Sequence, residues 1–123
     1  ETACRSAELV FAGIVETGFD LPRAQAYDVA SSVYVLSRLA GVTGDSRYSA
    51  LAAAARGWFD GRNPAGRPVY DRDAGRVGDG VDGHRVNAHS GAESNIVGAQ
   101  ALFDDAITLA RRLSESEALP AGV

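Results

Sequence analysis

Apolar side chains recur at helical spacing in four segments of this 123-residue chain, and that pattern restricts the fold more than any other feature. The segments cover roughly residues 3–17, 22–40, 45–59 and 95–113. None of them shows the sustained alternation of apolar and polar residues that is typical of strands. We therefore predict an all-α fold in which four main helices form two antiparallel α-hairpins.

Several helix ends carry local signals. Gly18 and Gly41 favour the ends of the first and second helices, and Pro22 favours the start of the second. Asp45 is a candidate N-cap for the third helix. The predicted apolar faces are Ala7, Val10, Phe11 and Ile14; Ala26, Val29, Val33, Leu36 and Ala40; Tyr48, Leu51, Ala52, Ala55, Trp58 and Phe59; and Ile96, Ala99, Phe103, Ala106, Ala110 and Leu113.

A long segment rich in glycine and aspartate, residues 60–90, separates the third and fourth helices. Loops longer than about 12–15 residues are uncommon in compact domains and are usually functional or disordered. The short runs near Val69-Tyr70 and Val77 could pair locally, but the pattern does not decide this. We predict one domain over residues 1–123, with a loose tail over residues 114–123. The first residue is not Met, which indicates a processed chain, an excised domain or a fragment.

Charge and composition exclude several classes of binding partner. The net charge is −4 and no basic stripe is present, so we expect no binding to nucleic acid. No apolar run approaches the ~18 residues needed to cross a bilayer, so we expect no membrane partner. The single cysteine, Cys4, excludes an intrachain disulfide and fits a reducing compartment. We therefore expect a cytoplasmic protein without a cofactor.

The polar stretch HRVNAHSGAES, residues 84–94, precedes the fourth predicted helix. Ser90 and Glu93 have the spacing of a capping box, in which each side chain hydrogen bonds to the backbone of the other residue. A second interpretation makes Glu93 a general acid or base, paired with Asp79 or Asp82, because glycoside hydrolysis needs two carboxyl groups at a defined separation. The sequence fixes no such distance, so the catalytic residues and the presence of any enzymatic activity stay open.

Other kinds of functional site agree poorly with the sequence. Residues 71–82 resemble a calcium loop, yet Gly75 and Arg76 stand at the fifth and sixth positions, where that loop needs an oxygen ligand and a glycine. His84 and His89 have no nearby cysteine, so we expect no metal site. No phosphate-binding P-loop motif is present. Ser90 lacks the neighbours that activate a nucleophile.

A polar binding surface remains the best local interpretation. Amides, carboxylates and aromatic rings are the groups that recognise sugars, because they pair with hydroxyl groups and cover apolar ring faces. Trp58 and Phe59 end the third helix at the mouth of the long loop, and we expect Phe59 in the core and Trp58 nearer the edge. Side chains of the sugar-recognising types in the loop region are Asn63, Tyr70, Asn87, His89 and Glu93.

Two segments together resemble a known group of proteins. TGDSRYSALAAAARGWFDGRNPAGRPVYDRDAGRVGDGV, followed by VNAHSGAES, is similar to the C-terminal helical region of bacterial glycosyltransferase-family proteins. That region has a T-G-D-x-R-Y helix start, a W-F-L-G-R-N-D-x-G-x-P-L-Y-D segment, a D-G element and an N-x-N-x-G-A-E-S-T element. The likeness is close over residues 43 to about 103 and loose over residues 19–42. Asp60, His89 and Asn95 depart from the pattern, which usually has an apolar residue, Asn and Thr there.

The resemblance implies a sugar-associated module built from α-hairpins and related to (α/α) toroids. The longer transferase domain of such proteins has no counterpart in this chain. We therefore expect an accessory domain that binds or organises a sugar, together with a transferase domain or a second copy of the chain. A structural or interaction bundle, and a fragment of a toroid enzyme that processes sugars, are the alternatives. The candidate substrate-binding residues are Arg62, Asn63, Tyr70, Asp79, Asn87, His89 and Glu93.

Overall fold

The computed structural model describes residues 2–117, except the side chains of residues 3, 7, 104–112 and 116–117. Its helical elements are α1 (Thr2–Ser6), the π-helical η1 (Ala7–Ala12), α2 (Gly13–Glu16), α3 (Ala26–Thr43), α4 (Ser46–Gly57), the 3-10 turn η2 (Trp58–Asp60) and α5 (Ala92–Glu117). Its strands are β1 (Arg23–Gln25), β2 (Tyr70–Asp71), β3 (Arg76–Val77), β4 (Gly80–Asp82) and β5 (Arg85–Val86).

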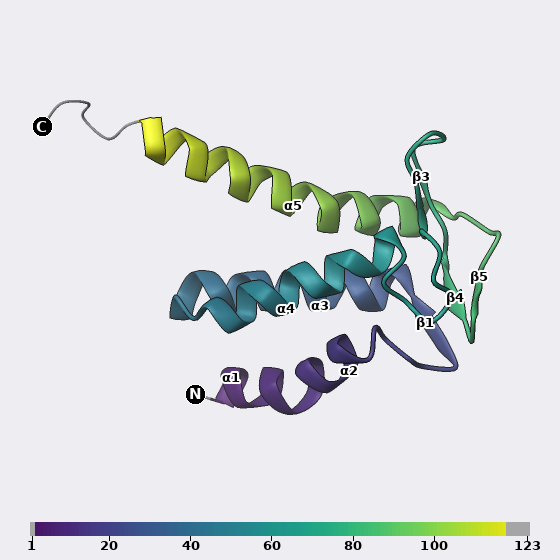
Figure 1. Cartoon of the computed structure of the whole chain (residues 1–123), viewed down its shortest axis with the longest axis horizontal. Helices are drawn as coiled ribbons and strands as arrows, with labels where there is room; N and C mark the ends of the chain where they lie inside the picture. Colours follow the sequence, from purple (N-terminus) through teal and green to yellow (C-terminus); the bar gives the residue numbers. More distant parts are fainter. Residues whose placement is uncertain (1, 118–123) are drawn as a thin grey trace, which may run out of the picture.

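Helix α3 is the centre of the helical part. It packs against both α4 and α5, and α2 contacts α4. Figure 1 shows α3 and α4 between α5 and the N-terminal helical segment, with the strands gathered at one end of the molecule. The predicted pairing of the first helix with the second, and of the third with the fourth, is therefore not the arrangement observed.

The prediction of an all-α fold is wrong, because five short strands within residues 2–117 form two antiparallel sheets. Strand β4 lies between β1 and β5, and β2 pairs with β3 in a hairpin. Each strand has only two or three residues, which is too short for an alternating pattern to be recognised in the sequence. The predicted (α/α) toroid has no support in this mixed architecture. The pairing of Tyr70 with Val77, which the sequence left open, is present.

Both boundaries of the second predicted helix differ from the sequence pattern, whereas the predicted start of the third helix is confirmed. Residues 23–25, predicted as helix, form β1, and α3 begins at Ala26, where Gln25 and Asp28 make a capping box. Helix α3 continues past Gly41 to Thr43 and ends at Gly44, whose φ of 69° is left-handed. The N-cap prediction for Asp45 is confirmed, since its carboxylate accepts a hydrogen bond from Arg47 N.

The predicted buried face of α5 is wrong over the side chains that the structure describes. Ile96, Phe103 and Leu113 are 59%, 67% and 58% exposed, whereas Ala101 is buried. Gly98 explains the rotation of the helix. A Cβ atom at Gly98 would lie 2.8 Å from Val77 Cγ2, so α5 approaches β3 closely through its small residues. Ala106 and Ala110 lie outside the described side chains, and the helix covers residues 114–117 of the predicted tail.

The core combines the helices with the strands. Trp58 and Phe59 are both fully buried, so the expected position of Trp58 nearer the edge is wrong. Their rings meet edge to face, with centroids 5.1 Å apart. The largest fully buried side chains are Trp58, Phe59, Leu36, Val29, Val33 and Val81.

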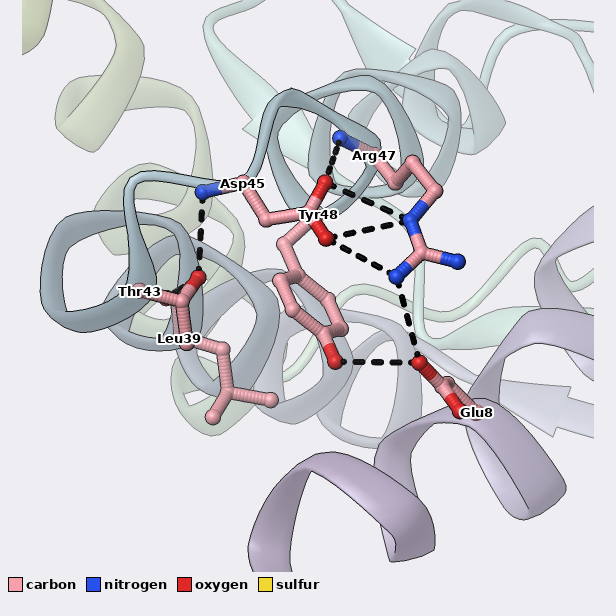
Figure 2. A network of polar contacts seen from close by, with 6 residues as sticks. All are labelled: Glu8, Leu39, Thr43, Asp45, Arg47 and Tyr48. Carbon is pink, nitrogen blue, oxygen red and sulfur yellow. Dashed lines mark hydrogen bonds and ion pairs between the residues drawn. The ribbon is translucent and has the colours of Figure 1, made fainter. Parts of the chain in front are cut away.

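A polar network fixes the N-terminal segment to α4 (Figure 2). The Arg47 guanidinium contacts the Asp45 carboxylate at 2.9 Å and the Glu8 carboxylate at 3.4 Å. The Tyr48 hydroxyl donates to Glu8 at 3.4 Å. Burial raises the pKa of Tyr48 to about 12, and the neighbouring Cys4 and Glu8 add to this rise. Tyr48 therefore keeps its proton, and its bond to Glu8, to a higher pH than an ordinary tyrosine would.

Candidate functional site

The predicted site residues divide into residues that hold the loops together and residues that line a cavity. Asn63 belongs to the first kind. Its amide nitrogen donates to Trp58 O at 2.8 Å and to Arg67 O at 2.9 Å, and its amide oxygen accepts from Ala65 N. These contacts use both of its N–H donors, so Asn63 closes the turn that follows η2.

Asn87 also stabilises a loop. Its amide nitrogen donates to the Asp82 carboxylate at 3.1 Å, and its amide oxygen accepts from His89 N at 2.9 Å. Asp82 in turn makes an ion pair with Arg23 of the neighbouring strand β1. Asn87 therefore ties the segment before α5 to the three-stranded sheet, which explains its position without a ligand.

The predicted capping box of Ser90 and Glu93 is wrong. The Ser90 hydroxyl donates to Val77 O at 2.7 Å and accepts from the Asn95 amide nitrogen at 2.8 Å. The Asn95 amide oxygen accepts from Val77 N at 2.8 Å. Together Ser90 and Asn95 satisfy both backbone groups of Val77 and fix the first turn of α5 to β3.

Asp79, from the loop before β4, caps α5 instead. Its carboxylate accepts from Gly91 N at 2.6 Å and from the Ser94 hydroxyl at 2.7 Å. These two bonds lower the pKa of Asp79 below its ordinary value of 3.8. Both bonds go to the same carboxylate oxygen, so Asp79 has a structural role at the start of α5.

Replacing Asp79 with Asn is expected to lower the melting temperature at pH 7, because the uncharged amide accepts hydrogen bonds more weakly at a helix start. The Asp79 pKa is lower in the folded state, so its stabilisation is fully present above the unfolded pKa and is lost as the pH falls through the folded pKa. The difference between wild type and Asp79→Asn should therefore shrink below pH 4 or so. Thermal unfolding followed by circular dichroism at several pH values measures this difference in melting temperature. Glu93→Gln, an exposed carboxylate of the same turn, is the control, and a difference that does not change with pH would contradict the capping role.

A cavity of about 460 Å³ lies between the end of α4, the β2–β3 hairpin and α5. Its volume is within the range of about 300–1,000 Å³ that is typical of small-molecule pockets. Its walls combine charged groups with aromatic and aliphatic side chains. The lining residues are Arg56, Asp60, Tyr70, Arg72, Gly75, Val77, Asn95, Ala99, Leu102 and Phe103.

Asp60 and Tyr70 both contact Arg72 at the wall of the cavity. The Arg72 guanidinium contacts the Asp60 carboxylate at 2.8 Å, and its central carbon lies 5.3 Å from the centre of the Tyr70 ring. The hairpin turn that carries Arg72 is held by Asp71, whose carboxylate accepts from the amides of Asp73 and Ala74. Arg72 is therefore positioned by an ion pair, a ring and a closed turn.

The other predicted site residues lie elsewhere. Arg62, together with Asn63, lines a hollow of about 360 Å³ next to His84. The His84 ring nitrogen Nδ1 is 3.0 Å from Pro64 O. His89 and Glu93 are exposed and do not line the 460 Å³ cavity. Of the seven predicted residues, only Tyr70 contributes to that cavity.

Asp60, Arg72 and Phe103 were not among the predicted site residues. Arg72 lies in the turn that follows β2, so no strand or helix spacing in the sequence marks it as a site residue. Asp60 was noted in the sequence as one aspartate of the long segment 60–90 and as a departure from the apolar residue of the resembling family, but not as a site residue. Phe103 was assigned to the buried face of α5, which the structure contradicts.

The described part of the chain holds no group of three or more His, Cys, Asp or Glu side chains arranged to bind a metal ion. None of the helices within residues 2–117 combines the length and the apolar character that crossing a bilayer requires. Neither a protein-family model nor a curated protein sequence matches the chain.

Proposed function

We propose that this chain is a carbohydrate-associated accessory domain that binds a sugar in the 460 Å³ cavity beside α5. One observation carries the proposal: the cavity combines the aromatic rings of Tyr70 and Phe103 with the charged groups of Asp60 and Arg72. Carboxylates accept from sugar hydroxyls, guanidinium groups donate to them, and aromatic rings cover the apolar faces of sugar rings. The likeness of residues 43–103 to a glycosyltransferase-associated region supports the same substrate class.

The surface of the chain supports a role as one part of a larger assembly. Large apolar side chains are exposed on several helices, among them Leu9 (75%), Val42 (85%) and Phe103 (67%). Burying such side chains against a partner would be favourable, because it removes apolar area from water. We therefore propose a transferase domain or a second copy of the chain as the partner. The single Cys4 fits a reducing compartment, and the proposal places the protein in the cytoplasm.

The same apolar surface favours a second candidate, an interaction module without a small-molecule ligand. The two functions differ in one measurable property, since only the first requires that a monosaccharide binds to the isolated chain. Sugar binding therefore decides between them.

Saturation-transfer-difference NMR with a panel of monosaccharides tests the sugar site. We expect binding to wild type and a loss of about tenfold or more in affinity for Tyr70→Leu, equivalent to ~1.4 kcal/mol, because the variant removes a ring from the cavity wall. Tyr34→Leu is the matched control. Tyr34 also has an arginine, Arg38, over its ring at 5.9 Å, but it lines a different groove and is exposed, whereas Tyr70 is half-buried.

Two outcomes would contradict the proposal. If no monosaccharide binds at tens of millimolar, the interaction module becomes the better account. If Tyr34→Leu weakens binding as much as Tyr70→Leu, the ligand lies in the groove between α3 and α5 and not in the proposed cavity.

A further inference from the structure

A groove of about 410 Å³ lies between α3 and α5, apart from the sugar cavity. Tyr27, Ser31 and Tyr34 line it on α3, and Val97 and Ala101 line it on α5. The two tyrosines are 54% and 58% exposed, although their rings are largely apolar. A partner that covered this groove would gain free energy by removing both rings from water.

The groove has a carboxylate at one end and a guanidinium group at the other. Figure 1 shows that α3 and α5 both begin where the strands are gathered, so the two helices run in the same direction. Glu93 lies one turn before Val97 on the same face of α5. Arg38 lies one turn after Tyr34 on the same face of α3. The acidic end of the groove is therefore next to the strands, and the basic end is the opposite one.

Neither of these two charges is neutralised within the part of the chain that the structure describes. Arg38 is exposed, and its contact is with the ring of Tyr34, whose centre is 5.9 Å from the central carbon of the guanidinium group. Glu93 is exposed and makes no ion pair with the described residues. Both groups are therefore available to a partner whose charges follow the reverse order along the groove.

The two charges are nearly symmetric about the middle of the groove. Arg38 follows the middle of the α3 wall, residue 31, by seven positions, and Glu93 precedes the middle of the α5 wall, residue 99, by six. With a rise of about 1.5 Å per residue, Arg38 and Glu93 lie about 10 Å and about 9 Å from the middle, in opposite directions. A two-fold rotation about the middle would therefore bring Glu93 of one copy of the chain to Arg38 of another.

We infer that a second copy of the chain binds in this groove in an antiparallel orientation, so that α5 of each copy lies over α3 of the other. Arg38 pairs with the partner's Glu93, and the same pair forms again at the other end, as a two-fold interface requires. Tyr27 and Tyr34 are covered between the two pairs. The inference rests on the proposed function only in its choice of partner, because the groove and the sugar cavity share no lining residue.

Sedimentation-velocity ultracentrifugation over a series of concentrations tests the inference by charge reversal. We expect wild type to form a dimer. Arg38→Glu and Glu93→Arg each place like charges opposite one another at both ends of the interface, and each should weaken the dimer about tenfold or more. An equal mixture of the two variants should form a dimer again, because one copy is then acidic at both ends and the other is basic at both ends.

Glu16→Arg is the matched control for these reversals. It reverses an exposed charge on α2, which lies on the opposite side of α3 and α4 from α5 (Figure 1), so it should leave the dissociation constant of the dimer unchanged. Arg38 and Glu93 are exposed, so their variants are expected to fold, and a melting curve for each variant checks this.

Three outcomes would overturn the inference. The first is a wild-type chain that stays monomeric up to about 1 mM, which would leave a transferase domain as the proposed partner. The second is a dimer that either reversal leaves as tight as in wild type, since the interface would then lie elsewhere. The third is a pair of weakened variants that do not associate when mixed, since Arg38 and Glu93 would then not face each other.

Sugar binding by Arg38→Glu separates this inference from the proposed function. Arg38 does not line the sugar cavity, so the variant should bind the monosaccharide panel as wild type does. If the charge reversals behave as expected and no sugar binds, the inference stands and the proposed function fails. If a sugar binds and wild type is a monomer, only the inference fails.

Discussion

Replacing Gly80 with alanine is expected to destabilise the protein by about 3 kcal/mol or more. An alanine Cβ at this position would collide with the carbonyl oxygen of Ala24 and would lie 3.1 Å from the Cα atom of Gln25. Both neighbours are backbone atoms of β1, so no side-chain rotation can relieve the contact. Strand β1 would have to separate from β4, and the burial of Ala24 and Val81 at their junction would be lost.

Thermal unfolding followed by circular dichroism measures this effect, and a fall in melting temperature of roughly 10 °C or more is expected. Gly41→Ala is the matched control. Gly41 is exposed near the end of α3, and a Cβ there would meet no atom within 4 Å, so alanine should be neutral or stabilising by about 0.5–1 kcal/mol. Equal melting temperatures for Gly80→Ala and wild type would show that β1 does not pack on β4 as described.

Replacing Trp58 with alanine is expected to cost about 3–5 kcal/mol, which is the range for truncating a large buried aromatic side chain. Trp58 is fully buried and its ring meets that of Phe59 edge to face. Since domains of this size have a total stability of about 5–15 kcal/mol, the variant would be marginally folded. Urea or guanidinium unfolding at equilibrium gives the free-energy difference.

Trp58→Phe separates ring packing from hydrogen bonding. The Nε1 atom of Trp58 has no hydrogen-bond partner among the described residues, so removing it leaves no group unpaired. This variant should therefore lose clearly less stability than Trp58→Ala. A loss as large as that of alanine would contradict the account, because it would mean that the indole N–H makes an essential bond. Leu9→Ala, at a 75% exposed position, is expected to change stability by ~0.5 kcal/mol at most.

The helices could be predicted because their apolar faces express the helical period over several turns. The third helix is the clearest case, where Asp45 provides the N-cap and Tyr48, Ala52 and Ala55 are buried as expected. The strands could not be predicted in the same way. Strand β1 has three residues, and its pairing with β4 joins segments that lie far apart in the sequence. Local patterns contain no information about such a contact.

The orientation of α5 illustrates a second limit of prediction from the sequence. The sequence pattern favours a buried face with bulky residues such as Ile96 and Phe103, yet both are exposed. The helix instead packs on Val77 through Gly98, because a residue without a side chain allows a closer approach. Hydrophobicity scales give glycine little weight, so the close contact was not recognisable from the sequence.

The candidate site was predictable only in part. Tyr70 was selected from the sequence and lines the cavity, whereas Asn63 and Asn87 satisfy backbone and side-chain groups of their own loops. Amides serve both purposes equally well, so residue type alone cannot separate a ligand contact from a loop contact. Arg72 becomes a site residue only through its ion pair with Asp60, which lies twelve positions earlier in the chain.

The central claim of this account is that a sugar binds between the β2–β3 hairpin and α5. Two-dimensional ¹H–¹⁵N NMR spectra, recorded while the tightest-binding sugar of the panel is added, test it most directly. We predict that the largest changes occur at the amides of Tyr70, Arg72 and Gly75, and that those of Tyr27 and Tyr34 stay unchanged. Changes confined to the groove that Tyr27 and Tyr34 line, or the absence of any change at saturating sugar, would contradict the claim.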